Sequence, residues 1–178
     1  TLAEVAALLG EAVQRQAVAS ARGAGCKYIP QTEDAWVEAD DFSPTFESQG
    51  VLVGLMPTSG AQWLLSEFLS VIEESNTTVN EATFAALQAS VEAGAIDDAL
   101  RQLASLAVTA GEWQIEALPA VSDAALTMYS DQEGYRLAFF LRSAADEGMV
   151  AIAVQLPLDR DVKAMQAAVV EILSNQNE

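Results

Sequence analysis

The sequence predicts an α+β fold in which helices pack against an antiparallel sheet and a C-terminal helix closes the structure. Apolar residues recur every three or four positions in long segments before Gly111 and alternate with polar ones after it. Two apolar runs in "GYRLAFFLRSAADEGMVAIAVQLP", Gly134 to Pro157, flank a polar tip that ends in glycine, the pattern of a β-hairpin. The length of 178 residues suffices for one core, so we predict a single domain over residues 1–178.

The first predicted element is an amphipathic helix over residues 1 to about 21, because apolar residues recur at helical spacing. "TLAE" forms a capping box at its start, and Gly23 and Gly25 are expected to end it. The period then changes, and "CKYI", "AWVEA" and "GVLVGLM" predict two or three short strands, the last from about Val51 to Met56. The helical stripe consists of Leu2, Val5, Leu9 and Val13.

Three helices are predicted in the middle of the chain. Pro57 ends the preceding strand, and Ser59 with Gln62 forms a capping box for the first helix. The second helix is expected to end at Gly94 and the third at Gly111. Their apolar stripes are Trp63, Leu64, Phe68, Leu69 and Ile72, then Val79, Phe84, Leu87 and Val91, then Ile96, Leu100, Leu103 and Ala107.

Strands return after Gly111. "EWQIEAL" alternates apolar and polar residues, as a strand with one wet face does, and "AALTMYS" and the two hairpin arms follow. Short connections favour neighbours, so the strands from Glu112 to Leu156 are expected to be consecutive in one antiparallel sheet. The second hairpin arm is apolar on both faces and is predicted to be central. The closing helix starts at Asp159 or Asp161 and buries Val162, Met165, Val169 and Ile172.

Charge and composition exclude several functional classes. The chain has 26 acidic and 8 basic residues, a net charge of −18, so phosphate backbones and anionic lipid surfaces would be repelled. No apolar run approaches the roughly 20 residues of a membrane helix. The sequence contains no histidine, which removes Ser-His-Asp and Cys-His relays. Cys26 is the only cysteine, so neither an intrachain disulfide nor a cysteine-rich zinc site is predicted.

We predict no catalytic, cofactor-binding or metal-binding residue. The densest acidic run lacks the spacing of a calcium loop and is interpreted as solvated; it comprises Glu33, Asp34, Glu38, Asp40 and Asp41. No phosphate-binding glycine loop or nucleophile motif occurs, and coincidental carboxylate pairs are expected in so acidic a chain. Cys26 is predicted to be inert, because only Lys27 is near it in sequence and should point to the opposite face of a strand.

The order of "LLG", "GCKY", "VLVGLMPTSGAQWLLSEF", "EWQIEALPAVSDAALTMYS" and "LAFFLR…GMVAIAV" resembles a bacterial family. It is similar to the extracytoplasmic lipoprotein and sensor-domain modules of Gram-positive and related bacteria, including the external domain of PknH-type receptor kinases. The resemblance implies an α+β fold, a location outside the cytoplasmic membrane and no catalysis. It assigns Asp123 to a turn in which Ser122 replaces the usual glycine. It places Cys26 where relatives carry a paired cysteine; the second cysteine is absent here, so a buried free thiol is expected.

Two functions are consistent with these observations. The first is a non-catalytic extracytoplasmic binding or sensing module, secreted or anchored through a segment upstream of Thr1, with a groove for a small molecule, peptide or lipid. The second is a scaffold or assembly subunit whose acidic surface binds a protein partner. The groove is expected to be lined by five aromatic residues, Trp36, Trp63, Trp113, Tyr129 and Phe140. These aromatic residues also fit an ordinary hydrophobic core.

Overall fold

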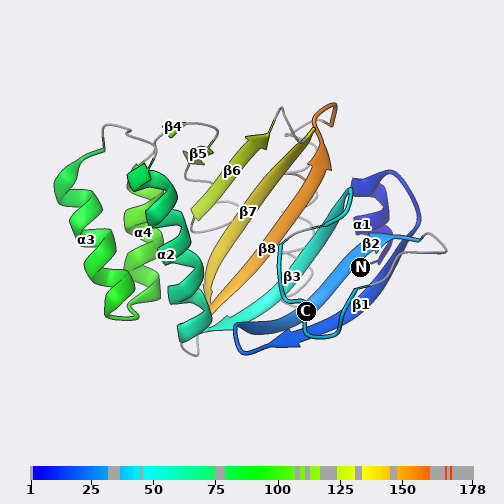
Figure 1. Ribbon diagram of the computed structural model, residues 1–178, viewed down its shortest axis with the longest axis horizontal. Helices are drawn as coiled ribbons and strands as arrows, with labels where there is room; N and C mark the ends of the chain where they lie inside the picture. The colour runs from blue at the N-terminus through cyan, green and yellow to red at the C-terminus, as the bar shows by residue number, and fades with distance from the viewer. Residues whose placement is uncertain are drawn as a thin grey trace.

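The computed structural model describes residues 2–31, 37–44, 46–74, 79–106, 109–110, 113–116, 124–130, 134–144, 148–160, 167 and 169, with side chains described outside β4, β5 and β6. These residues form an α+β structure with one antiparallel sheet, shown in Figure 1. Its elements are α1 (Leu2–Leu9), β1 (Val13–Ser20), β2 (Gly23–Pro30), β3 (Gly50–Pro57), α2 (Thr58–Glu74), α3 (Glu81–Glu92), α4 (Ile96–Leu106), β4 (Thr109–Ala110), β5 (Trp113–Glu116), β6 (Ala124–Ser130), β7 (Tyr135–Ala144) and β8 (Gly148–Pro157).

The strand order is β1-β2-β3-β8-β7-β6-β5-β4. Two runs of consecutive strands, β1 to β3 and β4 to β8, therefore meet where β3 pairs with β8. The predicted hairpin is confirmed as β7 and β8, and the predicted series of consecutive antiparallel strands from Glu112 to Leu156 is confirmed as β5 to β8. The short strand β4, which pairs with β5, was not predicted. The second hairpin arm, β8, is central as predicted, and most of its residues on both faces are buried.

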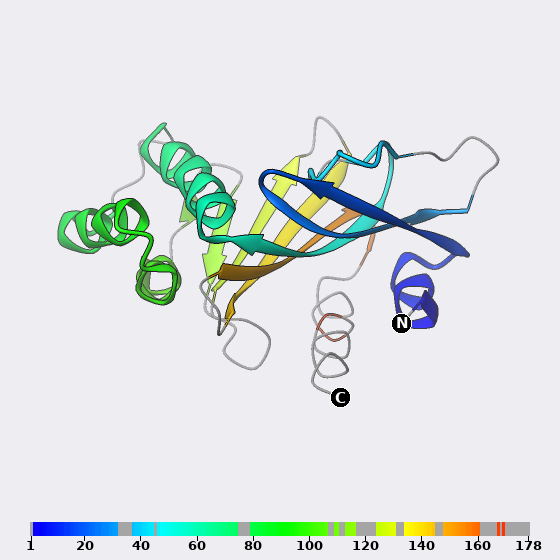
Figure 2. The same ribbon diagram turned by 90° about the horizontal axis from the view of Figure 1, so that it is seen from below.

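Each face of the sheet carries its own core. Alternate residues of β8 point to opposite faces, so Met149 and Ala151 join one core while Ile152 and Val154 join the other. The first, which we call the helical-side core, includes α2, α3 and α4, with an edge-to-face contact between Phe68 and Phe139 at 5.1 Å between ring centroids. The second, the α1-side core, includes α1. Figure 2 shows α1 below the sheet and α2, α3 and α4 at the opposite end of the molecule.

The prediction of one helix over residues 1 to about 21 is wrong. The α1 helix ends at Leu9, because Gly10 takes a left-handed conformation with φ of 75°. Arg160 Nη2 donates to the carbonyl oxygen of Leu9 at 2.9 Å and satisfies the helix end. The following residues pair with β2 as β1, so tertiary pairing overrides the apparent helical spacing. Gly23 and Gly25 are strand residues and do not end a helix.

Two smaller expectations also need correction. The described part of "AWVEA", Val37 to Ala39, is not a strand. The α2 helix already begins at Thr58, so Ser59 is not its N-cap. The side chain of Gln62 instead donates to the carbonyl oxygens of Val91 at 2.8 Å and Glu92 at 3.2 Å, and it caps the C-terminal end of α3.

The remaining predicted helices are described to different extents. The α3 and α4 helices match the predicted second and third helices of the middle region, and Gly94 with φ of 70° follows α3 as expected. The expectation that the third of these helices ends at Gly111 is wrong, because α4 ends at Leu106 and Thr109–Ala110 pairs with β5 as a strand. Of the predicted closing helix, Ala167 and Val169 are described as helical, and Val169 is buried in the α1-side core. Thr1 and most of the closing helix lie outside the described residues. No described helix combines the length and the apolar character that a membrane span requires.

Candidate functional site

The aromatic residues predicted to line a groove do not come together where the structure describes them. Trp63 is half-buried on α2 in contact with the helical-side core, and the Arg22 guanidinium lies 3.7 Å from its ring centroid. Phe140 is 3% exposed in the α1-side core, on the opposite face of the sheet. These two residues therefore cannot line one groove. Trp36 and the side chains of Trp113 and Tyr129 lie outside the described residues.

The acidic segment before β3 contains a structural ion pair. Lys27 is 1% exposed, and its Nζ donates to Asp41 Oδ2 at 2.6 Å and to Ser43 Oγ at 3.3 Å. Ser43 Oγ in turn donates to Asp41 Oδ1 at 2.6 Å. Burial raises the pKa of Asp41, but the hydrogen bonds from Lys27 and Ser43 outweigh it and leave this pKa below its usual value. The pair attaches the segment to β2, and the described residues contain no group of three or more metal-ligand candidates.

Ser43 and Lys27 do not form a nucleophile and base. Lys27 Nζ donates to Ser43 Oγ, and the Ser43 hydroxyl donates its own proton to Asp41 and not to the lysine. The trio therefore anchors the acidic segment to β2.

Cys26 lies on the opposite face of β2 from Lys27, as predicted. It is half-exposed, however, so the expectation of a buried thiol is wrong. Its Sγ accepts a hydrogen bond from Arg15 Nε at 3.0 Å, across the β1–β2 pair. The smaller residues Ala17 and Ala24 nearby are exposed, which explains why the thiol is not covered at this end of the sheet.

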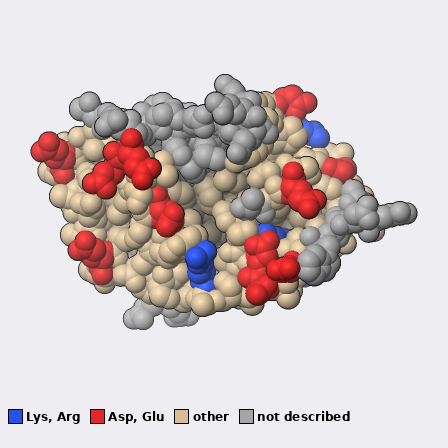
Figure 3. Space-filling view, viewed as in Figure 1, with Lys and Arg blue, Asp and Glu red and all other residues tan. Residues whose placement is uncertain are grey.

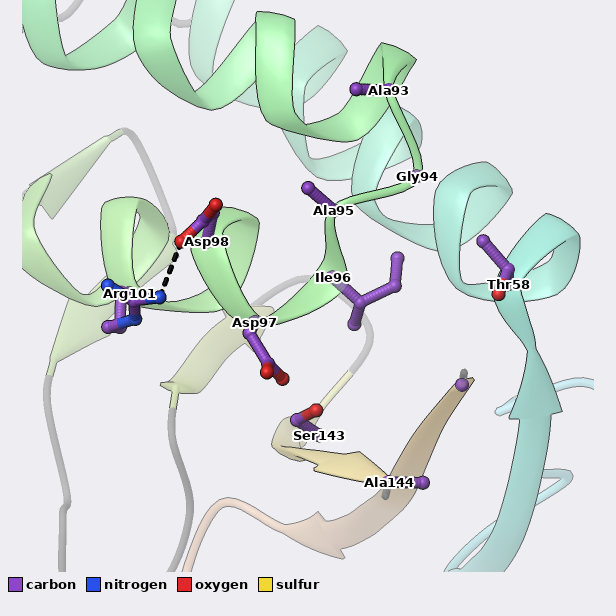
Figure 4. Close-up of a pocket in the computed structure, with 11 residues that line it drawn as sticks. Thr58, Ala93, Gly94, Ala95, Ile96, Asp97, Asp98, Arg101, Ser143 and Ala144 are labelled. Atoms are coloured by element: carbon purple, nitrogen blue, oxygen red, sulfur yellow. Dashed lines mark hydrogen bonds and ion pairs between the residues drawn. The ribbon is translucent and has the colours of Figure 1, made fainter. Parts of the chain in front are cut away.

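A pocket of about 610 Å³ opens between the helical layer and the end of the β7–β8 hairpin. We call it the hairpin pocket. Figure 4 shows that its walls come from the start of α2, from the turn between α3 and α4 with the first turns of α4, and from the hairpin. The described lining consists of Thr58, Ala93, Gly94, Ala95, Ile96, Asp97, Asp98, Arg101, Ser143, Ala144 and Gly148.

The register of the central strands brings these segments together. Pro57 pairs with Gly148, so the chain leaves β3 beside the end of the hairpin and enters α2 there. The two strands can approach closely here because Gly148 has no side chain: a Cβ at this position would lie 2.5 Å from the carbonyl oxygen of Met56. A Cβ on Gly94 would lie 3.0 Å from Thr58 Cγ2, and its positive φ turns the chain from α3 into α4 against the start of α2.

The first turn of α4 supplies the charged groups of the hairpin pocket. Ile96, Ala99 and Leu100 are buried and fix this helix against the sheet, so Asp97 and Asp98 fall on its exposed side. Asp98 forms an ion pair with Arg101 one turn later. Figure 4 shows Asp98 turned toward Arg101, while the Asp97 carboxylate is directed toward the part of the pocket where Ser143 lies.

The hairpin pocket therefore offers hydrogen-bonding and charged groups beside a small apolar wall. A hydroxyl comes from each of Thr58 and Ser143, carboxylates come from α4, and Ile96, Ala95 and Ala144 provide apolar contact. With no histidine in the chain, no imidazole base can activate either hydroxyl. This lining is suited to binding a ligand.

Sequence reasoning did not identify this pocket. Gly94 and Gly148 were visible as a helix end and a hairpin end, and Asp97 as an acidic residue in a first helical turn. The turn between α3 and α4 lies near the end of the hairpin because β3 pairs with β8. This pairing joins residues far apart in the chain, so no local sequence pattern predicts it.

Comparison of the chain with protein-family models, with curated proteins and with solved structures finds no match in any of the three. The functional assignment therefore depends on the geometry of the hairpin pocket.

Proposed function

We propose that the protein is a non-catalytic binding or sensing module and that the hairpin pocket is its ligand site. The observation that carries the proposal is a pocket of about 610 Å³ whose polar groups converge from three separate parts of the chain. Binding sites for small molecules commonly have volumes of roughly 300 to 1,000 Å³ and combine apolar walls with a few polar groups. The volume of the hairpin pocket falls within this range, and its lining places the polar groups of Thr58, Asp97, Arg101 and Ser143 beside the apolar side chain of Ile96.

The experiment has two steps. Native mass spectrometry of the purified protein reports a retained small molecule, and a fragment screen read by amide chemical shifts reports where added ligands bind. We expect ligand-induced shifts in residues 93–98 and in Ser143, Ala144 and Gly148. Ala144→Trp should fill the hairpin pocket and remove binding, whereas Ala89→Trp, on an exposed position of α3 outside the lining, should not. Equal binding to both variants, or shifts confined to other regions, would contradict the proposal.

The location of the protein is a separate part of the proposal. An extracytoplasmic setting, secreted or anchored through a segment upstream of Thr1, is supported by the sequence resemblance alone. The coding sequence upstream of Thr1 tests it: a signal sequence, lipobox or membrane helix supports the location, and an initiator methionine a few residues upstream contradicts it. Fractionation of cells that express the native gene gives an independent result.

The second candidate is a scaffold that binds a protein partner through its acidic surface. The net charge of −18 favours it, but Figure 3 shows acidic side chains in several separate groups on the visible face, with no single large patch. A partner held by general electrostatic attraction should be released by moderate salt. A stoichiometric partner that is retained at low salt and released as the salt concentration rises, with no small molecule retained in native mass spectrometry, would favour the scaffold over the ligand-binding module.

A further inference from the structure

We infer that the hairpin pocket binds its ligand through a positively charged amine, with Asp97 as the direct partner of the ammonium group. This inference rests on the proposed function and names the chemical class of the ligand. It does not follow from the acidity of the chain alone, because it depends on the arrangement of the groups that line the hairpin pocket.

The charged lining groups leave one carboxylate available for a ligand. Asp98 and Arg101 neutralise each other in an ion pair along α4. Asp97 has no ion pair with any described residue, and Figure 4 shows its carboxylate directed toward Ser143 on the opposite wall. A ligand placed between α4 and the hairpin therefore meets a carboxylate on one side and a hydroxyl on the other. An ammonium group donates three hydrogen bonds and can use both acceptors.

The partial charges of the helix ends do not cancel the negative charge of Asp97. The start of α2 and the end of α3 both reach the hairpin pocket, and their partial charges, about half an elementary charge each, have opposite signs and largely cancel. The start of α4 contributes another positive half charge, which is smaller than the full negative charge of Asp97. The local balance remains negative. The net charge of −18 adds a long-range field that attracts cations and repels anions.

The apolar residues of the hairpin pocket indicate what kind of carbon skeleton the ligand carries. Ile96, Ala95 and Ala144 can contact a short hydrocarbon or ring, and the volume admits a body larger than the ammonium group alone. We therefore assign the ligand to small organic amines whose carbon skeleton packs on this wall. Bare metal cations are not favoured, since the described lining contains two carboxylates and one of them is paired with Arg101.

The experiment uses three four-carbon probes that differ at one end: 4-aminobutan-1-ol, butane-1,4-diol and 4-hydroxybutanoate. Each is titrated into the full chain at about 0.15 M salt, which screens non-specific attraction between exposed charges, and amide shifts give the dissociation constant. We expect the amine to bind at residues 93–98 and at Ser143, Ala144 and Gly148 about tenfold more tightly than the diol, and the anion to bind least.

Two variants locate the interaction. Asp97→Asn keeps the shape of the side chain and should weaken amine binding about tenfold without changing diol binding. Glu92→Gln, which removes an exposed carboxylate at the end of α3 outside the lining, is the matched control and should leave the affinity unchanged. Asp97→Glu should restore part of the affinity. The unchanged spectrum of each variant outside the hairpin pocket verifies that it folds.

Three outcomes overturn the inference. If the diol binds in the hairpin pocket as tightly as the amine, the ligand class is wrong while the proposed function stands. If Asp97→Asn and Glu92→Gln weaken amine binding equally, the amine is attracted by general charge and Asp97 is not its partner. If none of the probes produces shifts at the hairpin pocket, and native mass spectrometry shows no retained ligand, both the inference and the proposed function fail.

Discussion

Removing Asp41 from its ion pair with Lys27 should destabilise the protein much more than removing Lys27. Lys27 is 1% exposed and Asp41 is 40% exposed, so the two partners differ in their access to water. Asp41→Asn leaves a buried ammonium without its carboxylate, and breaking a buried pair in this way costs about 3 to 5 kcal/mol. We expect about 3 kcal/mol, the lower end, because water reaches the exposed side of the site.

The reverse substitution should be much milder. Lys27→Met removes the buried charge, keeps a long flexible side chain beside the Phe46 ring, and leaves an Asp41 carboxylate that water can solvate. Replacing a buried charge by an apolar residue of similar size is often neutral or stabilising. Urea unfolding followed by circular dichroism measures both variants. For a chain of this length, a loss of 3 kcal/mol corresponds to a fall in melting temperature of about 6 to 12 °C.

The same pair predicts the direction of a pH effect. The pKa of Asp41 is lower in the folded protein than its ordinary value of 3.8. Its contribution to stability is therefore fully present above about pH 4 and is lost as the pH falls through the folded pKa. The wild-type protein should lose this contribution on acidification, and Asp41→Asn should not. Unfolding free energies of wild type and Asp41→Asn within about 0.5 kcal/mol of each other at neutral pH would refute the reasoning, as would a larger loss in Lys27→Met than in Asp41→Asn.

Three further predictions concern other parts of the structure. Gly148→Ala should lower the melting temperature by more than Gly134→Ala, because its Cβ would lie 2.5 Å from a backbone oxygen of β3, whereas Gly134 has positive φ but no atom within 4 Å of the added Cβ. Cys26 is only partly buried, so, contrary to the inert thiol expected from the sequence, it should react to completion with a thiol reagent in the native state; labelling only after addition of denaturant would contradict the structure. Calcium should raise the melting temperature no more than sodium chloride of equal ionic strength, since the Asp41 carboxylate is already bound to Lys27. A specific calcium site would instead add about 2.7 kcal/mol at a hundredfold excess over its Kd, and abolition of that gain by Asp40→Asn would identify the site.

The C-terminal strands could be predicted from the sequence because their signals are local. The two arms of the β7–β8 hairpin carry apolar runs on both sides of a turn, and the adjacent strands are joined by short connections. The N-terminal region could not be predicted in the same way. Val13 continues the helical spacing of Leu2, Val5 and Leu9 by coincidence, and β1 has few large apolar residues that would mark it as a strand. Its conformation comes from pairing with β2.

The candidate site was missed for a similar reason. The sequence contains Gly94, Asp97 and Gly148, but it gives no indication that a turn between two helices lies against the end of a hairpin about 50 residues later. The predicted aromatic groove does not form between Phe140 and Trp63, since the alternation of strand residues sends Phe140 to the face of the sheet opposite Trp63. Residue type alone does not determine which face of a central strand a side chain occupies.

The pairing of β3 with β8 also determines how the chain must fold. At one end of this pair, Pro57 and Gly148 are separated by about 90 residues, so forming the centre of the sheet closes a long loop at a cost of about 4 kcal/mol in chain entropy. The strands β1 to β3 and β6 to β8 can each form from near neighbours, whereas the contact between the two groups is distant in sequence. Until it forms, β3 and β8 both present open edges with apolar residues on both faces. We therefore expect the joining of these two edges to be the slow step of folding, and the chain to be most exposed to aggregation before it.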